Sequence, residues 1–416
     1  MRKLLRGRNL RGVASLIGAA AMVGAMSGGL SGASTRAMAS ERFHGPPITI
    51  AGTLGLTGAF SVPSADYKLV DEAWVNTVNA HGGLLGRKVE LTILNDNSTP
   101  TTASTDYQKF ISEKVNFILA PYTTYVGGPQ VPVVRAAGKL FYNGGFVGLQ
   151  YFEQDKGWMV GSYTYQDTTY SHGAFTVMKS LPPSKRPKKI AILYAANPFT
   201  VAANKGYNGT GGALTFAKRD GMKVVMDEQY PTGTTDFTST IEKAQAAGAQ
   251  ALIVLGLPTT SDLIAKTVKT IGWKPEVECM CGSQVTTLDN WYTLGAATNG
   301  VIGTDVAWES ENYPGMKQVE ALARKKHEKV VPSYSWAGWA ILQMIQQGVD
   351  GTHSTTTTKI RKWLLTHVVS TAVGKFKLLG NGSPPNREVV VQTVNGVQRT
   401  VWPPKIATAK IVTPLP

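Results

Sequence analysis

The sequence has 416 residues, of which 43% are hydrophobic and 17% charged, and it contains only two cysteines. This length suggests two domains, and the composition excludes a disordered chain or a disulfide scaffold. The formal net charge is +15, but six basic and no acidic residues lie in the first 39 residues, which leaves +9 for the rest. The other basic residues are scattered, so we expect no nucleic-acid partner.

Residues 1–39 predict a secretory signal peptide. A basic start from Arg2 to Arg11 precedes a short apolar stretch, Val13 to Met26, and Ala37-Met38-Ala39 fits a cleavage site. The stretch is too short for a membrane span, and no later run reaches about 18 apolar residues. We expect cleavage after Ala39, export and no stable membrane insertion; the alternative is an uncleaved N-terminal anchor.

Strands and helices alternate through the next part of the chain. Ile48 to Leu54 is rich in β-forming residues, and an apolar stripe then predicts a helix from Ala65 to Ala80, which Gly82-Gly83 ends. Further strands are predicted at 89–94, 116–120, 140–142, 189–194, 223–226 and 251–255. Such alternation indicates βαβ units and parallel sheets, and its restart after residues 163–167 indicates two α/β lobes.

The last part of the chain has a different pattern. An amphipathic helix is expected from Trp336 to Gln346 and a basic helix from Lys359 to His367. Val373 to Leu378 and Glu388 to Val394 are predicted to be antiparallel strands, joined through the turn-forming residues 380–385.

No constellation for catalysis or metal binding can be assembled from the sequence. The six histidines are isolated, and neither a phosphate-binding loop nor, after residue 39, a nucleophile elbow occurs. The glycine-rich Gly209 to Gly212 does not follow a strand in the dinucleotide-binding register. We expect no enzyme activity, no metal and no cofactor.

The two cysteines, Cys279 and Cys281, occupy alternate positions of a strand-like run and would face the same side. Two partly buried free thiols are favoured over a strained disulfide between them.

Several segments, taken in order, resemble type I periplasmic solute-binding proteins of ABC transporters, the Leu/Ile/Val-binding type. The resemblance covers nearly all of the chain after the signal peptide. It rests on residues 53–58, 79–91, 95–98, 118–124, 141–145, 235–237 and 402–410.

The resemblance implies two Rossmann-like α/β lobes with parallel sheets, joined by three crossovers and closing on a ligand by hinge motion. Lobe I would comprise residues 47–165 and 304–368, and lobe II residues 166–303 and 369–405, followed by a tail at 406–416. A small solute would bind in the cleft, at strand ends and helix N-termini.

The resemblance also implies the residues of the ligand site. Tyr122, Thr123 and Thr124 would grip a ligand carboxylate through a hydroxyl and backbone N–H groups, or Thr123 and Thr124 could only cap a helix. Gly144, Gly145 and Phe146 would complete the grip, unless the glycines only serve a turn. The other candidates are Phe60, Tyr165, the aromatic Phe199, which could instead be core, and Leu257, where relatives often carry a tyrosine.

One candidate departs from the family pattern. Amino-acid binders usually place a second-lobe carboxylate against the ligand's ammonium group, whereas Gln284 aligns with that position. A glutamine favours a ligand without an ammonium, namely an organic or aromatic acid or an amide, and the aromatic residues expected in the cleft, which also include Tyr163, suit a ring. Asp262 and Asp289 are close in sequence and could supply the carboxylate instead.

The resemblance therefore implies a periplasmic solute-binding protein that delivers a small molecule to a membrane permease. Two alternatives stay open, a binding protein that reports a solute to a signalling receptor and an exported two-lobe enzyme.

Overall fold

The computed structural model describes residues 43–282, 286, 289–308, 310–326 and 328–416. The predicted signal peptide and Gln284 lie outside them. Residues 45–416 form one compact unit.

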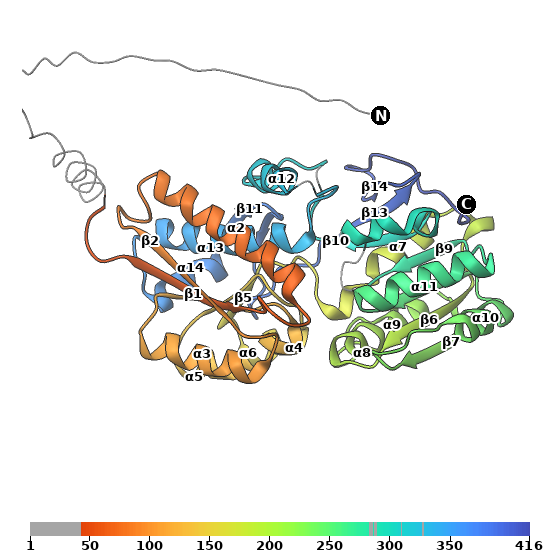
Figure 1. Ribbon diagram of the computed structural model, residues 1–416, viewed down its shortest axis with the longest axis horizontal. Coiled ribbons are helices and arrows are strands. Elements are labelled where there is room, and N and C mark those ends of the chain that lie inside the picture. Colours follow the sequence, from red (N-terminus) through yellow and green to blue (C-terminus); the bar gives the residue numbers. More distant parts are fainter. Residues whose placement is uncertain (1–42, 283–285, 287–288, 309, 327) are drawn as a thin grey trace, which may run out of the picture. The chain divides into compact units, whose positions relative to one another are not determined.

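The first sheet has five parallel strands in the order β2-β1-β3-β4-β5. Figure 1 labels β1, β2 and β5 of this sheet. Its strands are β1 (Ile48–Leu54), β2 (Val89–Asn95), β3 (Phe117–Leu119), β4 (Phe141–Asn143) and β5 (Met159–Gly161). The helices of this part are α2 (Ser61–Ala80), α3 (Pro100–Ser112), α4 (Thr124–Gly127), α5 (Gln130–Ala136) and α6 (Leu149–Asp155). Helix α2 thus begins four residues before its predicted start.

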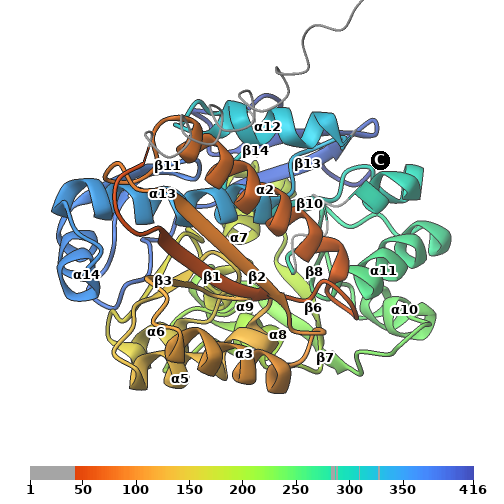
Figure 2. The ribbon, with the colours of Figure 1, turned by 60° about the vertical axis from the view of Figure 1, so that its left-hand side comes forward.

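The first sheet carries a core on each face, because its strands are buried on both sides. On one face, Ile48 and Ile50 pack with Trp74 of α2 and with α13 (Ser333–Thr352). On the other face, Ala51 and Ile118 pack with α3 and α5. Figure 2 shows these helices and the strands of the first sheet from another side.

The second sheet has seven strands in the order β14-β13-β10-β9-β8-β6-β7. Its strands are β6 (Lys189–Ala195), β7 (Lys223–Tyr230), β8 (Ala251–Leu255), β9 (Val277–Met280), β10 (Ile302–Asp305), β13 (Val389–Val394) and β14 (Val397–Trp402). Strands β6 to β10 are parallel, whereas β13 and β14 add an antiparallel edge. The α/β architecture with parallel sheets is therefore confirmed.

Helices again cover both faces of the second sheet. They are α7 (His172–Ser180), α8 (Pro198–Lys205), α9 (Ala213–Arg219), α10 (Thr238–Ala246) and α11 (Pro258–Ile271), with short 3-10 helices η1 (Asp167–Thr169), η2 (Pro183–Lys185) and η4 (Asp289–Thr298). Side chains of α7, α8 and α9 pack in the core on one face of the sheet, and side chains of α10 and α11 pack in the core on the other face.

One predicted strand pair is wrong. The segment predicted at 373–378 contains β12 (Gly374–Lys377), which pairs with β11 (Val368–Thr371) in a separate two-stranded sheet. The segment predicted at 388–394 is β13, which pairs with β10 and β14. The prediction failed because a tight turn at 371–374 lets residues 374–377 fold back on the strand before them.

These pairings bear on where the lobes meet. Strand β10 is hydrogen-bonded into the second sheet up to Asp305, and β11 contacts α13, which packs on α2 beside the first sheet. Helices α12 (Met316–Lys325) and α14 (Thr357–Thr366) also contact α13. The tail lies on the second sheet's side, where the Leu415 N–H donates to the Pro275 carbonyl at 3.0 Å. We propose lobe boundaries near residues 164, 306 and 387.

Candidate functional site

Aromatic rings gather where β1, β3 and the start of α2 meet. The ring of Tyr122, which follows β3, lies 5.9 Å from the ring of Phe60 and 5.7 Å from that of Tyr67, between centroids. Tyr334, in the first turn of α13, lies 5.6 Å from Tyr67 and 6.2 Å from Tyr122. Burial raises the pKa of Tyr122 to about 12, so its hydroxyl stays protonated at neutral pH.

A second run of rings continues from this cluster to the second sheet. The Tyr67 hydroxyl lies 2.8 Å from the Tyr163 hydroxyl. Ring centroids are then 6.3 Å apart between Tyr163 and Tyr165, 4.8 Å between Tyr165 and Tyr170, and 4.9 Å between Tyr170 and Phe199 of α8. We call the whole series the aromatic row: Phe60, Tyr122, Tyr67, Tyr163, Tyr165, Tyr170 and Phe199.

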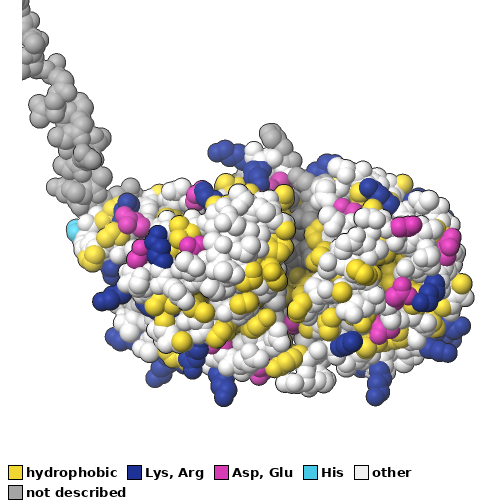
Figure 3. All heavy atoms as spheres, turned by 60° about the horizontal axis from the view of Figure 1, so that its bottom comes forward, with side chains coloured by type: hydrophobic (Ala, Val, Ile, Leu, Met, Phe, Trp, Pro, Cys, Tyr) yellow, Lys and Arg dark blue, Asp and Glu magenta, His cyan; other side chains and the backbone are white. Residues whose placement is uncertain are grey.

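The members of the aromatic row differ in exposure. Phe60, Tyr122 and Phe199 are half-buried, whereas Tyr67, Tyr163, Tyr165 and Tyr170 are buried. Tyr165, a predicted ligand contact, is only 1% exposed and so supports its neighbours from within. Figure 3 shows a furrow between the two halves of the molecule, with hydrophobic side chains on both sides of it. The row therefore offers ring surface at its two ends.

Local sequence explains how Phe199 is presented. Asn197 accepts a hydrogen bond from the Thr200 N–H at 3.1 Å, and Pro198 follows at the first helical position. These are strong signals for a helix start. Phe199 is thereby fixed in the first turn of α8.

Thr123 and Thr124 have different surroundings. The Thr124 hydroxyl donates to the Val147 carbonyl at 2.7 Å, so its only hydrogen is used within the first lobe. Thr123 is the N-cap residue of α4, half-buried, and its side chain makes no capping bond. Thr123 is thus the better placed of the two hydroxyls to donate to an anion.

The loop after β4 is fixed from inside the protein. The Asn143 Oδ1 atom accepts the N–H groups of Gly145 at 3.1 Å and Phe146 at 3.0 Å, so both of these groups are occupied. The ring of Phe146 is 3% exposed and packs in the first-lobe core beside Phe141. A side chain could not replace either glycine, since a Cβ at Gly145 would lie 2.4 Å from the Pro121 carbonyl oxygen. Gly144 presents its carbonyl, which accepts the Tyr67 hydroxyl at 2.7 Å.

The remaining second-lobe candidates lie at the start of α11 and just after β9. Leu257 is the N-cap residue of α11 and is half-buried; its N–H donates to the Thr260 hydroxyl at 3.2 Å. Gln284 and the side chain of Asp289 lie outside the described part of the chain. Asp262 accepts from the Asn290 side chain at 2.6 Å, and burial raises the pKa of its carboxyl to about 6.

Asp305, which the sequence reasoning did not consider, ends β10 beside the aromatic row. Its Oδ1 atom accepts the Val306 N–H at 2.6 Å, whereas its Oδ2 atom is buried without a hydrogen-bond partner. Burial raises the pKa of Asp305 to about 7, so near neutral pH a large part of this carboxyl is uncharged. It would be a weak partner for a cation.

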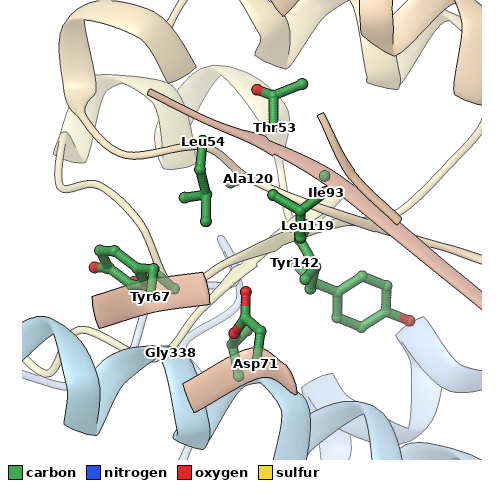
Figure 4. Close-up of a pocket in the computed structure, with 12 residues that line it drawn as sticks. Thr53, Leu54, Tyr67, Asp71, Ile93, Leu119, Ala120, Tyr142 and Gly338 are labelled. Carbon is green, nitrogen blue, oxygen red and sulfur yellow. The ribbon is translucent and has the colours of Figure 1, made fainter. Parts of the chain in front are cut away.

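A small cavity lies behind the aromatic row, between the first sheet, α2 and α13 (Figure 4). Its volume is about 10 Å³, enough for one water molecule. Asp71 points into it from α2, and burial raises the pKa of this carboxyl well above its ordinary value. A solute does not fit there.

The expectation of two free thiols is wrong. Cys279 and Cys281 form a disulfide, and both are buried. Alternate residues of a strand point to the same side, and here the Cα atoms are only 5.2 Å apart, within the range that a disulfide spans.

Among the described residues, no group of three or more His, Cys, Asp or Glu side chains is placed to hold a metal ion. None of their helices is both long and apolar enough to cross a membrane.

The sequence reasoning missed three rings of the cluster, Tyr67, Tyr170 and Tyr334. Tyr67 and Tyr334 lie on helices that were predicted, but the predicted start of α13 fell three residues after its actual start at Ser333. Only the spatial packing of α2 against α13 brings Tyr67 and Tyr334 together.

Comparisons with known proteins agree with this architecture. The family described as periplasmic binding protein matches residues 47–398. The Leu/Ile/Val-binding protein homolog 3 of Brucella melitensis is 22% identical over 313 residues, which cover 74% of this chain and 80% of the relative.

Solved structures are similar over most of their length. The leucine-, isoleucine-, valine-, threonine- and alanine-binding protein of Brucella ovis has a TM-score of 0.74 at 17% identity, covering 84% of this chain and 90% of its own. A leucine-binding protein of Thermotoga maritima has a TM-score of 0.70 at 16% identity, covering 85% and 97%. At such identities these structures establish the fold.

Proposed function

Because the chain belongs to the periplasmic binding protein family, of the branched-chain amino acid type, we propose that it captures one small solute between its lobes for an ABC uptake transporter. Closure of the lobes over the solute would create the form that docks on the membrane permease. A ligand drives such closure only by binding the closed state better than the open one. Export to the periplasm through the predicted signal peptide belongs to the same proposal.

We propose further that the solute is an organic acid or amide without an ammonium group, and that it contains an aromatic ring. The aromatic row carries this inference. Its half-buried ends are Phe60 with Tyr122 in one lobe and Phe199 in the other, so ring surface is available from both lobes. Ring pairs of this kind contribute about 0.5–1.5 kcal/mol beyond the area they bury.

The carboxylate or amide oxygen of the solute would meet Thr123. Its hydroxyl makes no capping bond, and the N–H groups that open α4 follow directly. A hydrogen bond to a charged oxygen contributes about 1.5–3 kcal/mol. The Thr124 hydroxyl is held by Val147 and would only support this loop.

The carboxyl groups near the second lobe's side of the site support a ligand without an ammonium. Asp262 is hydrogen-bonded to Asn290, and the Asp305 carboxyl is buried with a pKa of about 7. A buried ammonium needs a charged and accessible partner. The Asp305 carboxyl is buried and partly uncharged near neutral pH, so it is not such a partner, and a glutamine at position 284 would not be one either. The Asp262 carboxyl, with a pKa of about 6, is mostly charged at neutral pH but is engaged by Asn290.

Thermal unfolding of residues 40–416 with a panel of solutes tests the proposal. The panel contains benzoate and hydroxybenzoates, aliphatic carboxylates, aliphatic amides, and leucine, isoleucine and valine. A ligand at about a thousand times its Kd stabilises a protein by about 4 kcal/mol, which raises Tm by several degrees. We expect a shift with aromatic acids or amides; a shift with the three amino acids alone would contradict the proposed ligand class.

A further inference from the structure

The chain passes between the two sheets three times within the described residues. It leaves the first sheet after β5 through residues 162–166, and leaves the second sheet after β10 through residues 306–315. It returns to the second sheet through residues 378–388, which join β12 to β13. Any movement of one lobe against the other must be absorbed in these three connections.

Arg387 of the third connection is paired with the first connection through its backbone. The Arg387 N–H donates to the Thr164 carbonyl at 2.5 Å, and the Thr164 hydroxyl donates to the Arg387 carbonyl at 2.7 Å. The two connections are thus held side by side at this residue.

The guanidinium of the same residue reaches the second connection. Its Nη1 atom donates to the Val306 carbonyl at 2.8 Å and to the Val373 carbonyl at 3.1 Å. Its Nη2 atom forms an ion pair with the Glu311 carboxylate. The guanidinium also lies over the ring of Tyr313, 5.4 Å from the ring centroid.

Glu311 is itself fixed, which makes the pair rigid. Its side chain is only 3% exposed, and its second oxygen, Oε2, accepts the Trp308 N–H at 3.2 Å. An arginine suits this place because its planar fork can serve two carbonyls and a carboxylate at once, whereas a lysine ammonium offers no fixed fork.

We propose that Arg387 is a positioning residue that ties the three connections into a single hinge, so that the two lobes turn about one axis when they close. The inference rests on the proposed function, in which the lobes close on a solute. Without the guanidinium, the second connection would lose the hydrogen bond at Val306 and the ion pair at Glu311 that attach it to Arg387. The lobes would then sample a wider range of relative orientations before any ligand binds.

The distance between the lobes, measured without ligand, tests this role. Cysteines introduced as Glu113→Cys, after α3, and Lys218→Cys, on α9, carry spin labels on exposed positions of the two lobes. The native cysteines form a disulfide and leave no competing thiol. Double electron–electron resonance then gives the distribution of distances between the two spin labels for each variant.

We expect Arg387→Gln to broaden this distribution by about twofold, as expected for a hinge freed of a constraint, and Arg387→Lys to restore part of the native width. Arg399→Gln, at an exposed arginine on β14, is the matched control and should match the unsubstituted protein. A lower Tm with an unchanged distribution in Arg387→Gln would overturn the proposal, since it would leave Arg387 only a structural role.

Glu311→Gln keeps the measurement informative if Arg387→Gln does not fold. It removes the ion pair but retains an oxygen that can accept the Trp308 N–H, and it should broaden the distribution in the same direction; an unchanged width would count against the hinge. The label distances are measured without ligand. A broader distance distribution in Arg387→Gln, together with no Tm shift from any solute of the panel, would therefore reject the proposed function while still supporting the role of Arg387 in the hinge.

Discussion

The hydroxyl groups of Tyr67 and Tyr163 lie 2.8 Å apart, and the direction of the bond between them can be deduced. Tyr67 has one hydroxyl hydrogen, which it donates to the Gly144 carbonyl at 2.7 Å. Tyr163 must therefore donate to Tyr67. This pair joins α2, the loop after β4 and the first connection between the sheets.

Removing the Tyr67 hydroxyl should destabilise the protein. Tyr67→Phe leaves the buried Gly144 carbonyl without this donor and Tyr163 without this acceptor. Burying an unsatisfied polar group costs about 1–3 kcal/mol, which lowers Tm by several degrees. Thermal unfolding should show that, in the double-mutant cycle of Tyr67→Phe and Tyr163→Phe, the stability losses of the two single variants do not add. Strict additivity would mean that the bond contributes nothing.

The two threonines before α4 should separate binding from stability. Thr123→Val removes the hydroxyl proposed to face the solute, so we expect affinity to fall about tenfold or more with little change in Tm. Thr124→Val removes the bond to Val147, so we expect a loss of about 1 kcal/mol in stability and a smaller effect on affinity.

Calorimetric titration with the best solute of the panel, together with thermal unfolding, measures both effects. Should Thr124→Val abolish binding while Thr123→Val binds normally, the carboxylate would lie against the other hydroxyl.

Asp305 should make stability depend on pH in a defined direction. Burial raises its pKa in the folded state to about 7, whereas an unfolded aspartate has a pKa of about 3.9. Between pH 4 and pH 7 the folded state binds a proton that the unfolded state has released. The contribution of Asp305 to the free energy of unfolding is therefore greatest below pH 4 and is lost as pH rises toward 7. The loss is at most about 1.4 kcal/mol per pH unit.

Asp305→Asn should remove this dependence, since an amide does not titrate. Relative to the unsubstituted protein, the variant should gain stability between pH 4.5 and pH 8, as followed by urea unfolding at each pH. Asp236→Asn is the control, because hydrogen bonds from Thr238 hold the pKa of that exposed carboxyl below its ordinary value, which gives the opposite sign. A parallel pH profile for Asp305→Asn and the unsubstituted protein would exclude the raised pKa.

The disulfide between Cys279 and Cys281 should be present but contribute little to stability. It closes a loop with a sequence separation of only 2, so its restriction of the unfolded chain is worth about 1–2 kcal/mol. The intact mass of the purified protein should rise by two hydrogens on reduction after denaturation. Reaction of both thiols with a maleimide before any reduction would show that the disulfide is not formed.

Sequence reasoning predicted the elements with a strong apolar pattern and failed where strand pairing depends on distant residues. Strand β8, at Ala251–Leu255, was predicted with its observed ends because it is a continuous apolar run. The partner of β12 was not predictable from the apolar pattern alone, which is the same for either neighbour.

The same limit applies to the candidate site. Phe60, Tyr122 and Phe199 were named from the family resemblance, and the structure places all three in the aromatic row. Phe146 was named on the same basis, yet its ring packs in the first-lobe core, because Asn143 turns the loop inward through two N–H groups. No local pattern distinguishes these two outcomes.

The most direct test of the account is a calorimetric titration of the best panel solute against variants from each lobe. Tyr122→Ala removes a ring from the first lobe and Phe199→Ala one from the second, while Tyr207→Ala, which removes a ring that is not a member of the row, is the control. If the solute lies between the ends of the aromatic row, both variants should lose about five- to tenfold in affinity, at about 1–1.5 kcal/mol per ring, and the control should bind normally. Unchanged affinity in both variants would contradict a solute held between the two lobes at this site.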